Sequence, residues 1–226
     1  MKIKRAGDKI WLSHSGLELL ERCPRCFWLR YKMGIKQPEG ITSRLPVRFD
    51  QIIKKYFNSY RAINEIPPLI KDKVVGKLEN PFQETYFYPV TQKYGFYGKL
   101  DECLIANDGK YTVVDFKTTS TDPNNNKEIY PSYQNQLDIY AFLLESKGKK
   151  SSGIGHLIYF YPECSEKLHE GFPVTVKVET IEVNPTAVMP RLLKAIEVLE
   201  GNCPAASSTC EFCQWHQEVS EIITNI

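Results

Sequence analysis

The order of helix-like and strand-like segments in this chain of 226 residues predicts an α/β fold. Three observations lead to it. A helical period of apolar residues runs from Val47 to Ala62. Strand-like segments then follow on both sides of an Asp-Gly turn. A second helical segment, Ser132 to Ser146, is followed by further strands. Helices that alternate with strands in this way are expected to flank a central sheet.

The first third of the chain is predicted to be mainly helical. Ser13 is a suitable N-cap for a short helix that ends near Cys23 and Pro24. Residues 38–46 contain prolines at both ends and are predicted to form a loop before the helix from Val47. The prolines at 67 and 68 end that region of helix.

Strands dominate the middle of the chain. Alternating apolar residues predict strands at Glu84–Val90, Tyr94–Ala106 and Tyr111–Lys117, and the polar segment Thr118–Tyr130 is predicted to be a loop. After the second helix, the expected elements are strands at His156–Tyr161 and Val174–Val183, a helix from Pro185 to about Glu200, and a cysteine-bearing tail.

The turn at residues 107–109 predicts which residues face each other in the hairpin. Asp-Gly between apolar runs is a strong hairpin signal, and a loop centred on Asp108 pairs residues whose numbers sum to 216. Asp101 then lies opposite Asp115, with their Cβ atoms roughly 5 Å apart. Two facing carboxylates repel each other unless a cation lies between them. Lys117 projects to the same face as Asp115, so the hairpin predicts a metal-assisted hydrolytic site.

Composition sets broad limits on the protein. A net charge of +2 and 42% hydrophobic residues are ordinary for a globular protein and permit nucleic-acid binding without arguing for it. The length suits one domain, or one domain with a small appendage. No apolar run is long enough for a membrane span, so a cytoplasmic protein with reduced cysteines is expected.

Two C-x-x-C pairs, one near each end of the chain, predict a metal site. The first choice of ligands is Cys23, Cys26, Cys210 and Cys213, although Cys203 or His216 are alternatives for the fourth ligand. Such a site is expected to be structural and to join residues 13–35 to residues 201–226 as a clamp. Four thiolates suit either Zn²⁺ or a [4Fe–4S] cluster, and the spacing does not separate them.

The hairpin and the second helix together resemble the PD-(D/E)XK nuclease superfamily, specifically its RecB-like branch. The residues that carry this resemblance are Gly98…Asp101, then Asp115-Phe116-Lys117, then Gln136…Tyr140. The resemblance implies a restriction-endonuclease-like core, a mixed central sheet flanked by helices, over residues 1–226. It also implies a Mg²⁺- or Mn²⁺-dependent DNA nuclease, an exonuclease or flap-type enzyme that acts on single strands or free ends.

The resemblance assigns a role to each motif residue. Asp101, Asp115 and the backbone carbonyl of Phe116 would hold the metal, and Lys117 would orient water or stabilise the transition state. Gln136 and Tyr140 lie four residues apart on one helix face and would position substrate and catalytic groups.

One family feature is absent from the early helix. RecB-like nucleases often carry a metal-binding His there, and this chain has none between Val47 and Ala62. Asp50 is the candidate third carboxylate, with Glu84 and Glu102 as weaker ones.

The cysteines extend the resemblance to the iron–sulfur subgroup, which includes the CRISPR-adaptation exonuclease and the AddAB nuclease part. That similarity favours [4Fe–4S] over Zn²⁺ and implies a helicase or other repair or adaptation protein as a partner. The late cysteines depart from the subgroup pattern, because no third cysteine follows Cys213. The competing interpretation is a catalytically silent nucleic-acid-binding module with a structural metal site.

Overall fold

The computed structural model describes residues 9–38, 40, 43–125, 129–164, 171 and 173–224. Contacts between residues divide the chain into two compact units. Unit 1 comprises residues 1–41, 87–97 and 187–226, and unit 2 comprises residues 42–86 and 98–186. The predicted catalytic motifs lie in unit 2, whereas both cysteine pairs lie in unit 1.

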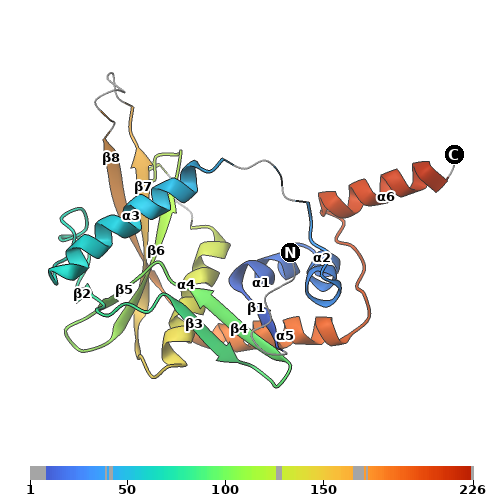
Figure 1. Cartoon of the computed structure of the whole chain (residues 1–226), viewed down its shortest axis with the longest axis horizontal. Helices are drawn as coiled ribbons and strands as arrows, with labels where there is room; N and C mark the ends of the chain where they lie inside the picture. Colours follow the sequence, from blue (N-terminus) through green and yellow to red (C-terminus); the bar gives the residue numbers. More distant parts are fainter. Residues whose placement is uncertain are drawn as a thin grey trace. The chain divides into compact units, whose positions relative to one another are not determined.

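Unit 2 is built on a mixed five-stranded sheet with the order β2-β5-β6-β7-β8 (Figure 1). Its strands are β2 (Lys77–Leu78), β5 (Glu102–Ile105), β6 (Tyr111–Thr118), β7 (Ser151–Pro162) and β8 (Val174–Glu182). β6 and β7 are parallel, and the other neighbouring pairs are antiparallel. The parallel pair requires a crossover, which the helix between them provides.

Two helices pack on this sheet. On β6, Val114 and Phe116 face α3 (Leu45–Ala62), where Phe57 contacts the Phe116 ring at a centroid distance of 4.6 Å. Residues 113, 115 and 117 alternate to the opposite face. α4 (Pro131–Glu145) packs against β6 and β7 there and buries Leu137. The mixed sheet flanked by helices is the predicted fold, so the fold class is confirmed.

The hairpin has the predicted register. Cys103 pairs with Val113 and Glu102 with Val114, so the numbers of each pair sum to 216. The amide of Ala106 donates to the carbonyl of Lys110 at 2.8 Å and closes the turn. Gly109 has φ +78°, a conformation that L side chains rarely adopt. The Asp-Gly turn therefore sets the alignment of β5 with β6.

The prediction of one strand from Tyr94 to Ala106 is wrong. The structure has β4 (Tyr94–Lys99) in a three-stranded sheet of order β1-β4-β3, whereas β5 belongs to the five-stranded sheet. Hydrogen-bond partners change at the junction: the Leu100 amide donates to the Glu84 carbonyl at 2.8 Å, and the Asp101 carboxylate accepts from the Phe116 amide. The break turns Asp101 toward β6.

Unit 1 is mainly helical. Its elements include β1 (Ile10–Leu12), α1 (His14–Arg22), α2 (Pro24–Trp28), a π-helical turn η1 (Leu29–Met33), α5 (Val188–Glu200) and α6 (Glu211–Thr224). The 3-10 turn η3 (Pro185–Ala187) precedes α5, and β3 (Thr85–Pro89) borders β4. Ser13 caps α1 as predicted, since its side chain accepts from the Gly16 amide.

The C-terminal segment is more regular than predicted. It was expected to be a tail, but residues 211–224 form α6, in which Phe212 and Trp215 are exposed. Their spacing of three residues is a helical signal that sequence reasoning missed. Among the described residues, no helix combines the length and apolarity needed to cross a membrane.

Candidate active site

Two carboxylates meet where β5 begins and β6 approaches its C-terminal end. Asp115 lies on β6 with its side chain 1% exposed, and Asp101 lies just before β5 with its side chain 17% exposed. The Phe116 amide donates to Asp101 Oδ2 at 3.1 Å, which holds that carboxylate beside the strand that bears Asp115. The hairpin register thus brings both acidic residues to one place.

Gly98 permits the close approach of its strand to α4. A Cβ built on Gly98 would lie 2.4 Å from Cδ1 of Leu143, a fully buried residue of α4. A larger residue would push this helix away, and Gln136 and Tyr140 belong to the same helix. The glycine of the G-x-x-D motif therefore acts through packing.

One hydrogen-bonded network connects the remaining motif residues. Lys117 Nζ lies 2.6 Å from Asp115 Oδ2 and donates to Gln136 Oε1 at 2.7 Å. Gln136 Nε2 donates to Asp115 Oδ1 at 2.7 Å and to the Tyr140 hydroxyl at 2.6 Å. Tyr133 packs its ring under the Lys117 ammonium at 4.2 Å. The three sequence motifs form one connected group.

The Tyr140 end of this network is uncharged. Burial raises the pKa of Tyr140 well above its usual value, and the nearby Asp115 carboxylate raises it further. The phenol therefore stays protonated at neutral pH. Tyr140 is also 95% buried, so it packs in the core while its hydroxyl contacts Gln136.

Asp115 has an incompletely satisfied carboxylate. Its Oδ2 is buried and has no hydrogen-bond partner among the described residues, because the nearby Lys117 ammonium pairs with it by charge without hydrogen-bond geometry. Burial raises the pKa of Asp115 to about 7, with Lys117 lowering it and Asp101 raising it. A buried oxygen without a donor, beside a second carboxylate, fits a hard divalent cation.

Asp115 should make folding stability depend on pH when no divalent ion is added. Its folded pKa of about 7 lies above the usual aspartate value of 3.8, so stability is greatest at low pH and is lost as pH rises toward 7. The loss is at most about 4 kcal/mol, from 1.36 kcal/mol per pKa unit. Denaturant unfolding between pH 5 and pH 8 measures it. Asp115→Asn should remove this slope, and an unchanged slope in that variant would contradict the assignment.

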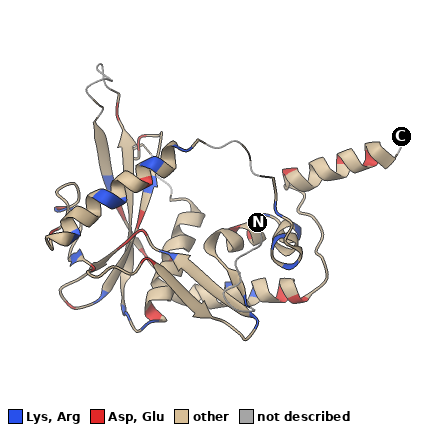
Figure 2. Cartoon of the chain, in the orientation of Figure 1, with Lys and Arg blue, Asp and Glu red and all other residues tan. Residues whose placement is uncertain are grey.

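Lys54 on α3 contacts Asp101 and lies near two further carboxylates. Its Nζ lies 2.9 Å from Asp101 Oδ1, 3.0 Å from Asp50 Oδ1 and 3.9 Å from Glu84 Oε1. Burial lowers the pKa of Lys54, but Asp101 and Asp50 raise it more, and it ends above its usual value. Asp50, predicted as a third metal ligand, is therefore near Asp101 but paired with a lysine. Figure 2 shows basic residues recurring along α3 with an acidic residue among them.

A polar cavity of about 390 Å³ adjoins Asp101. Its lining residues are Lys54, Asn58, Arg61, Asn80, Pro81, Phe82, Glu84, Asp101 and Glu102. Glu102 was a weak candidate ligand, but its carboxylate is held by Arg61 at 2.5 Å and its side chain is only 1% exposed. Sequence reasoning missed this ion pair because Arg61 and Glu102 are distant in the chain. Arg61, a basic residue near the end of α3, is thus paired and buried.

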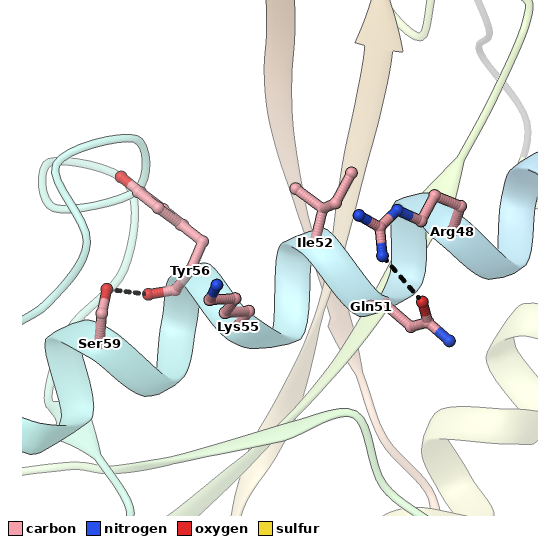
Figure 3. Close-up of a pocket in the computed structure, with 6 residues that line it drawn as sticks. All are labelled: Arg48, Gln51, Ile52, Lys55, Tyr56 and Ser59. Atoms are coloured by element: carbon pink, nitrogen blue, oxygen red, sulfur yellow. Dashed lines mark hydrogen bonds between the residues drawn. The ribbon is translucent and has the colours of Figure 1, made fainter.

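A second concave surface follows another side of α3 (Figure 3). It measures about 480 Å³ and is lined by Arg48, Gln51, Ile52, Lys55, Tyr56 and Ser59. Arg48, Ile52 and Tyr56 point to the same side of the helix in Figure 3. Lys55 is exposed here, whereas the neighbouring Lys54 faces the carboxylates. The two lysines of α3 thus serve different surfaces.

A family model matches the sequence of this chain, in agreement with the geometry of the Asp101, Asp115 and Lys117 site. The model of the PD-(D/E)XK nuclease superfamily matches residues 70–217, which is more than half of the chain. The chain belongs to this superfamily. This PD-(D/E)XK nuclease therefore has a restriction-endonuclease-like fold and a nucleic-acid substrate. No curated protein matches its sequence.

Solved structures with similar folds include exonucleases. A putative exonuclease from Eubacterium rectale is 14% identical with a TM-score of 0.49, and the match covers 95% of this chain and 93% of that one. SSO0001 is 16% identical with a TM-score of 0.47, covering 89% and 80%. An alkaline exonuclease from Laribacter hongkongensis is 8% identical with a TM-score of 0.42, covering 96% and 95%.

The nuclease also contains a cluster of four cysteines in unit 1. The Sγ atoms of Cys23, Cys26, Cys210 and Cys213 all lie within 4.8 Å of one another. Individual Sγ–Sγ distances are 3.5 Å for Cys26–Cys213, 3.7 Å for Cys26–Cys210 and 3.8 Å for Cys23–Cys213. The alternatives for the fourth ligand, Cys203 and His216, are exposed and outside this cluster. The structure thus brings together the four residues of the first choice.

The cysteines differ in their readiness to lose a proton. Burial raises the pKa of Cys26 to about 11 and also raises that of Cys213. For Cys23, burial acts in the same direction, but hydrogen bonds from the backbone of Ser207 and Cys26 outweigh it and lower the pKa to about 7. Four adjacent thiolates would repel one another, so the cluster needs a cation to become fully deprotonated.

Proposed function

We propose that this protein is a Mg²⁺- or Mn²⁺-dependent deoxyribonuclease that hydrolyses phosphodiester bonds at single strands or free ends. The observation that carries the proposal is the buried Asp115 carboxylate, which has a second carboxylate, Asp101, as a neighbour and the Lys117 ammonium 2.6 Å from its Oδ2. An ordinary structural ion pair between Asp115 and Lys117 explains neither the second carboxylate nor the links to Gln136 and Tyr140.

Asp101, Asp115 and the Phe116 carbonyl would hold the divalent ion. When bound, that ion would polarise the scissile phosphate and acidify a water molecule. Asp101 is already oriented by the Phe116 amide, and Asp115 by Gln136. Both carboxylates are therefore held in position by uncharged donors before an ion binds.

Lys117 would place its ammonium near the reacting phosphate. Its charge is held by Asp115 and by the Gln136 carbonyl oxygen, and the Tyr133 ring limits its movement. A fixed cation stabilises the negative charge that develops on a phosphoryl group in the transition state. Gln136 and Tyr140 are then positioning residues, because Gln136 connects Lys117 and Asp115 to the buried phenol.

The concave surface of α3 in Figure 3 suits contact with a nucleic-acid strand. Arg48 and Lys55 are exposed cations that can approach phosphates, and Tyr56 offers an aromatic ring. DNA as the substrate, a helicase or adaptation protein as a partner, and membership of the RecB-like branch rest on the sequence resemblance.

The proposed activity is tested with end-labelled single-stranded DNA, duplex DNA and RNA. We expect cleavage of DNA with Mg²⁺ or Mn²⁺ and none when these ions are omitted and trace ions are chelated. Single strands should be cleaved faster than duplex with blocked ends. Absence of cleavage with both ions, from protein with its cysteine site filled, would favour the catalytically silent binding module, in which case DNA should still be retained in a binding assay.

We infer that the cysteine cluster binds one tetrahedral Zn²⁺. With metal–sulfur bonds of about 2.3 Å, thiolates at the corners of a tetrahedron lie about 3.8 Å apart. Three of the six Sγ–Sγ distances are 3.5–3.8 Å and match this edge, and all six are within 4.8 Å. In a [4Fe–4S] cluster each thiolate binds a different iron, which spreads the sulfurs to on the order of 6 Å. The geometry favours the zinc alternative over the iron–sulfur cluster that the resemblance implies.

A further inference from the structure

Lys54 occupies a position where a second cation would otherwise be expected. Its ammonium lies 3.0 Å or less from one oxygen each of Asp50 and Asp101, and Glu84 lies 3.9 Å away. These carboxylates come from α3, from the segment before β3 and from the segment before β5. Glu84 has a closer cation in Lys99, at 3.0 Å, so Asp50 and Asp101 are the two carboxylates that depend on the Lys54 charge.

The Lys54 ammonium and β6 contact different oxygens of Asp101. Asp101 Oδ1 faces Lys54, whereas Oδ2 accepts from the Phe116 amide on the strand of Asp115. One carboxylate therefore connects two cation positions. Lys117 supplies charge next to Asp115, and Lys54 supplies it next to Asp101.

We propose that Lys54 provides a fixed positive charge beside Asp101 in place of a second divalent ion, so that the centre takes only one. The inference rests on the proposed metal-dependent function. An ammonium 2.9 Å from Oδ1 of Asp101 occupies that oxygen and repels a divalent cation nearby. Two-metal centres need both positions open to ions about 4 Å apart.

The location of Lys54 also suits a role in the reaction. Lys54 lines the cavity of about 390 Å³ together with Asp101 and Glu84. A phosphate that enters this cavity would meet the Lys54 ammonium next to the carboxylate that holds the ion. A cation held in place by Asp50 needs no reorganisation to stabilise charge on the phosphate.

α3 contains no histidine and no unpaired carboxylate that could bind a second metal ion. Residues 45–62 contain no histidine, and Asp50, their one acidic residue, is paired with Lys54 at one turn of spacing. The composition of α3 therefore favours a bound ammonium at this position over a bound metal.

The number of divalent ions bound by the protein tests this inference. Mn²⁺ is added to the full chain with its cysteine site filled, and free Mn²⁺ is counted by electron paramagnetic resonance. Wild type should bind one Mn²⁺, and Asp115→Asn should lose it. Lys54→Met should bind two, because Asp50 and Asp101 lose the ammonium that pairs with both of them. The first ion should bind about tenfold more tightly or better once the repulsion is removed.

Two matched variants separate charge from structure. Lys54→Arg keeps a cation and should bind one Mn²⁺. Lys55→Met removes a lysine from the adjacent position, which faces the other surface of α3, and should also bind one. Melting curves show whether each variant is folded, and a misfolded Lys54→Met is replaced by Lys54→Gln.

The number of Mn²⁺ ions bound tests both the inference about Lys54 and the proposed nuclease function. Two ions in wild type, or only one in folded Lys54→Met, would overturn the inference about Lys54 and leave the proposed nuclease function standing. No ion in wild type would overturn both. One ion in wild type and two in Lys54→Met, with one in Lys54→Arg, would establish that the lysine replaces the second ion.

Discussion

Replacing Lys117 with alanine is expected to lower the rate of DNA cleavage by about 10³-fold or more while the protein stays folded. The ammonium is the cation closest to the buried Asp115 carboxylate, at 2.6 Å. Without it, the centre loses charge stabilisation of the reacting phosphate, and Gln136 loses the donor to its carbonyl oxygen. The measurement is the initial rate of cleavage of end-labelled DNA at saturating Mg²⁺.

Two controls show whether a loss of cleavage arises at the site and whether DNA binding is retained. Lys147→Ala removes an exposed lysine beyond α4 and should leave the rate unchanged within about twofold. Binding of DNA by Lys117→Ala, measured with Ca²⁺ in place of Mg²⁺, should remain within about tenfold of wild type. If Lys117→Ala keeps more than a tenth of the wild-type rate, Lys117 does not have the proposed role.

Replacing Cys26 with serine is expected to remove zinc from the protein and to lower its melting temperature by about 10 °C or more. Structural zinc contributes on the order of 10 kcal/mol to folding in small domains, and the cluster joins α2 to the segment that begins α6. Elemental analysis should give one zinc per chain for wild type and almost none for the variant.

The other cysteines provide matched controls for this prediction. Cys164 and Cys203 are exposed and lie outside the cluster, so Cys164→Ser and Cys203→Ser should keep the zinc and the melting temperature. Anaerobically purified wild type should be colourless. Iron with acid-labile sulfide, and the visible absorption that accompanies them, would instead show that the cluster is [4Fe–4S] and that the proposed zinc site is wrong.

The site depends on contacts between residues that are close in the sequence and on contacts between residues that are far apart in it. The hairpin register and the pair Gln136 and Tyr140 follow from patterns within a few residues, namely a turn and a helical spacing. Those patterns were sufficient to predict that Asp101 and Asp115 lie together. The ion pairs of Lys54 and of Arg61 join α3 to strands some 40 residues away, and no local pattern announces them.

The roles of the basic residues on α3 also depend on segments that are distant in the sequence. In the sequence, Lys54, Lys55 and Arg61 are similar basic residues of one helical segment, and no local pattern separates their roles. In the structure one faces carboxylates, one is exposed on the surface of Figure 3, and one is buried with Glu102. Their positions around the helix axis differ, and what each meets depends on the strands that the helix covers.

The sequence by itself determined the α/β class, the hairpin with its facing carboxylates, and the four cysteines that gather in unit 1. Each of these depends on short-range geometry, such as turn residues, alternation along a strand and C-x-x-C spacing. Only the tertiary structure decided that the predicted strand is interrupted at Leu100 and Asp101, that Lys54 is held between Asp50 and Asp101, and that the four sulfurs lie within 4.8 Å of one another. Those features depend on which distant segments pack together, because charge pairing and metal–ligand distances are properties of the assembled fold.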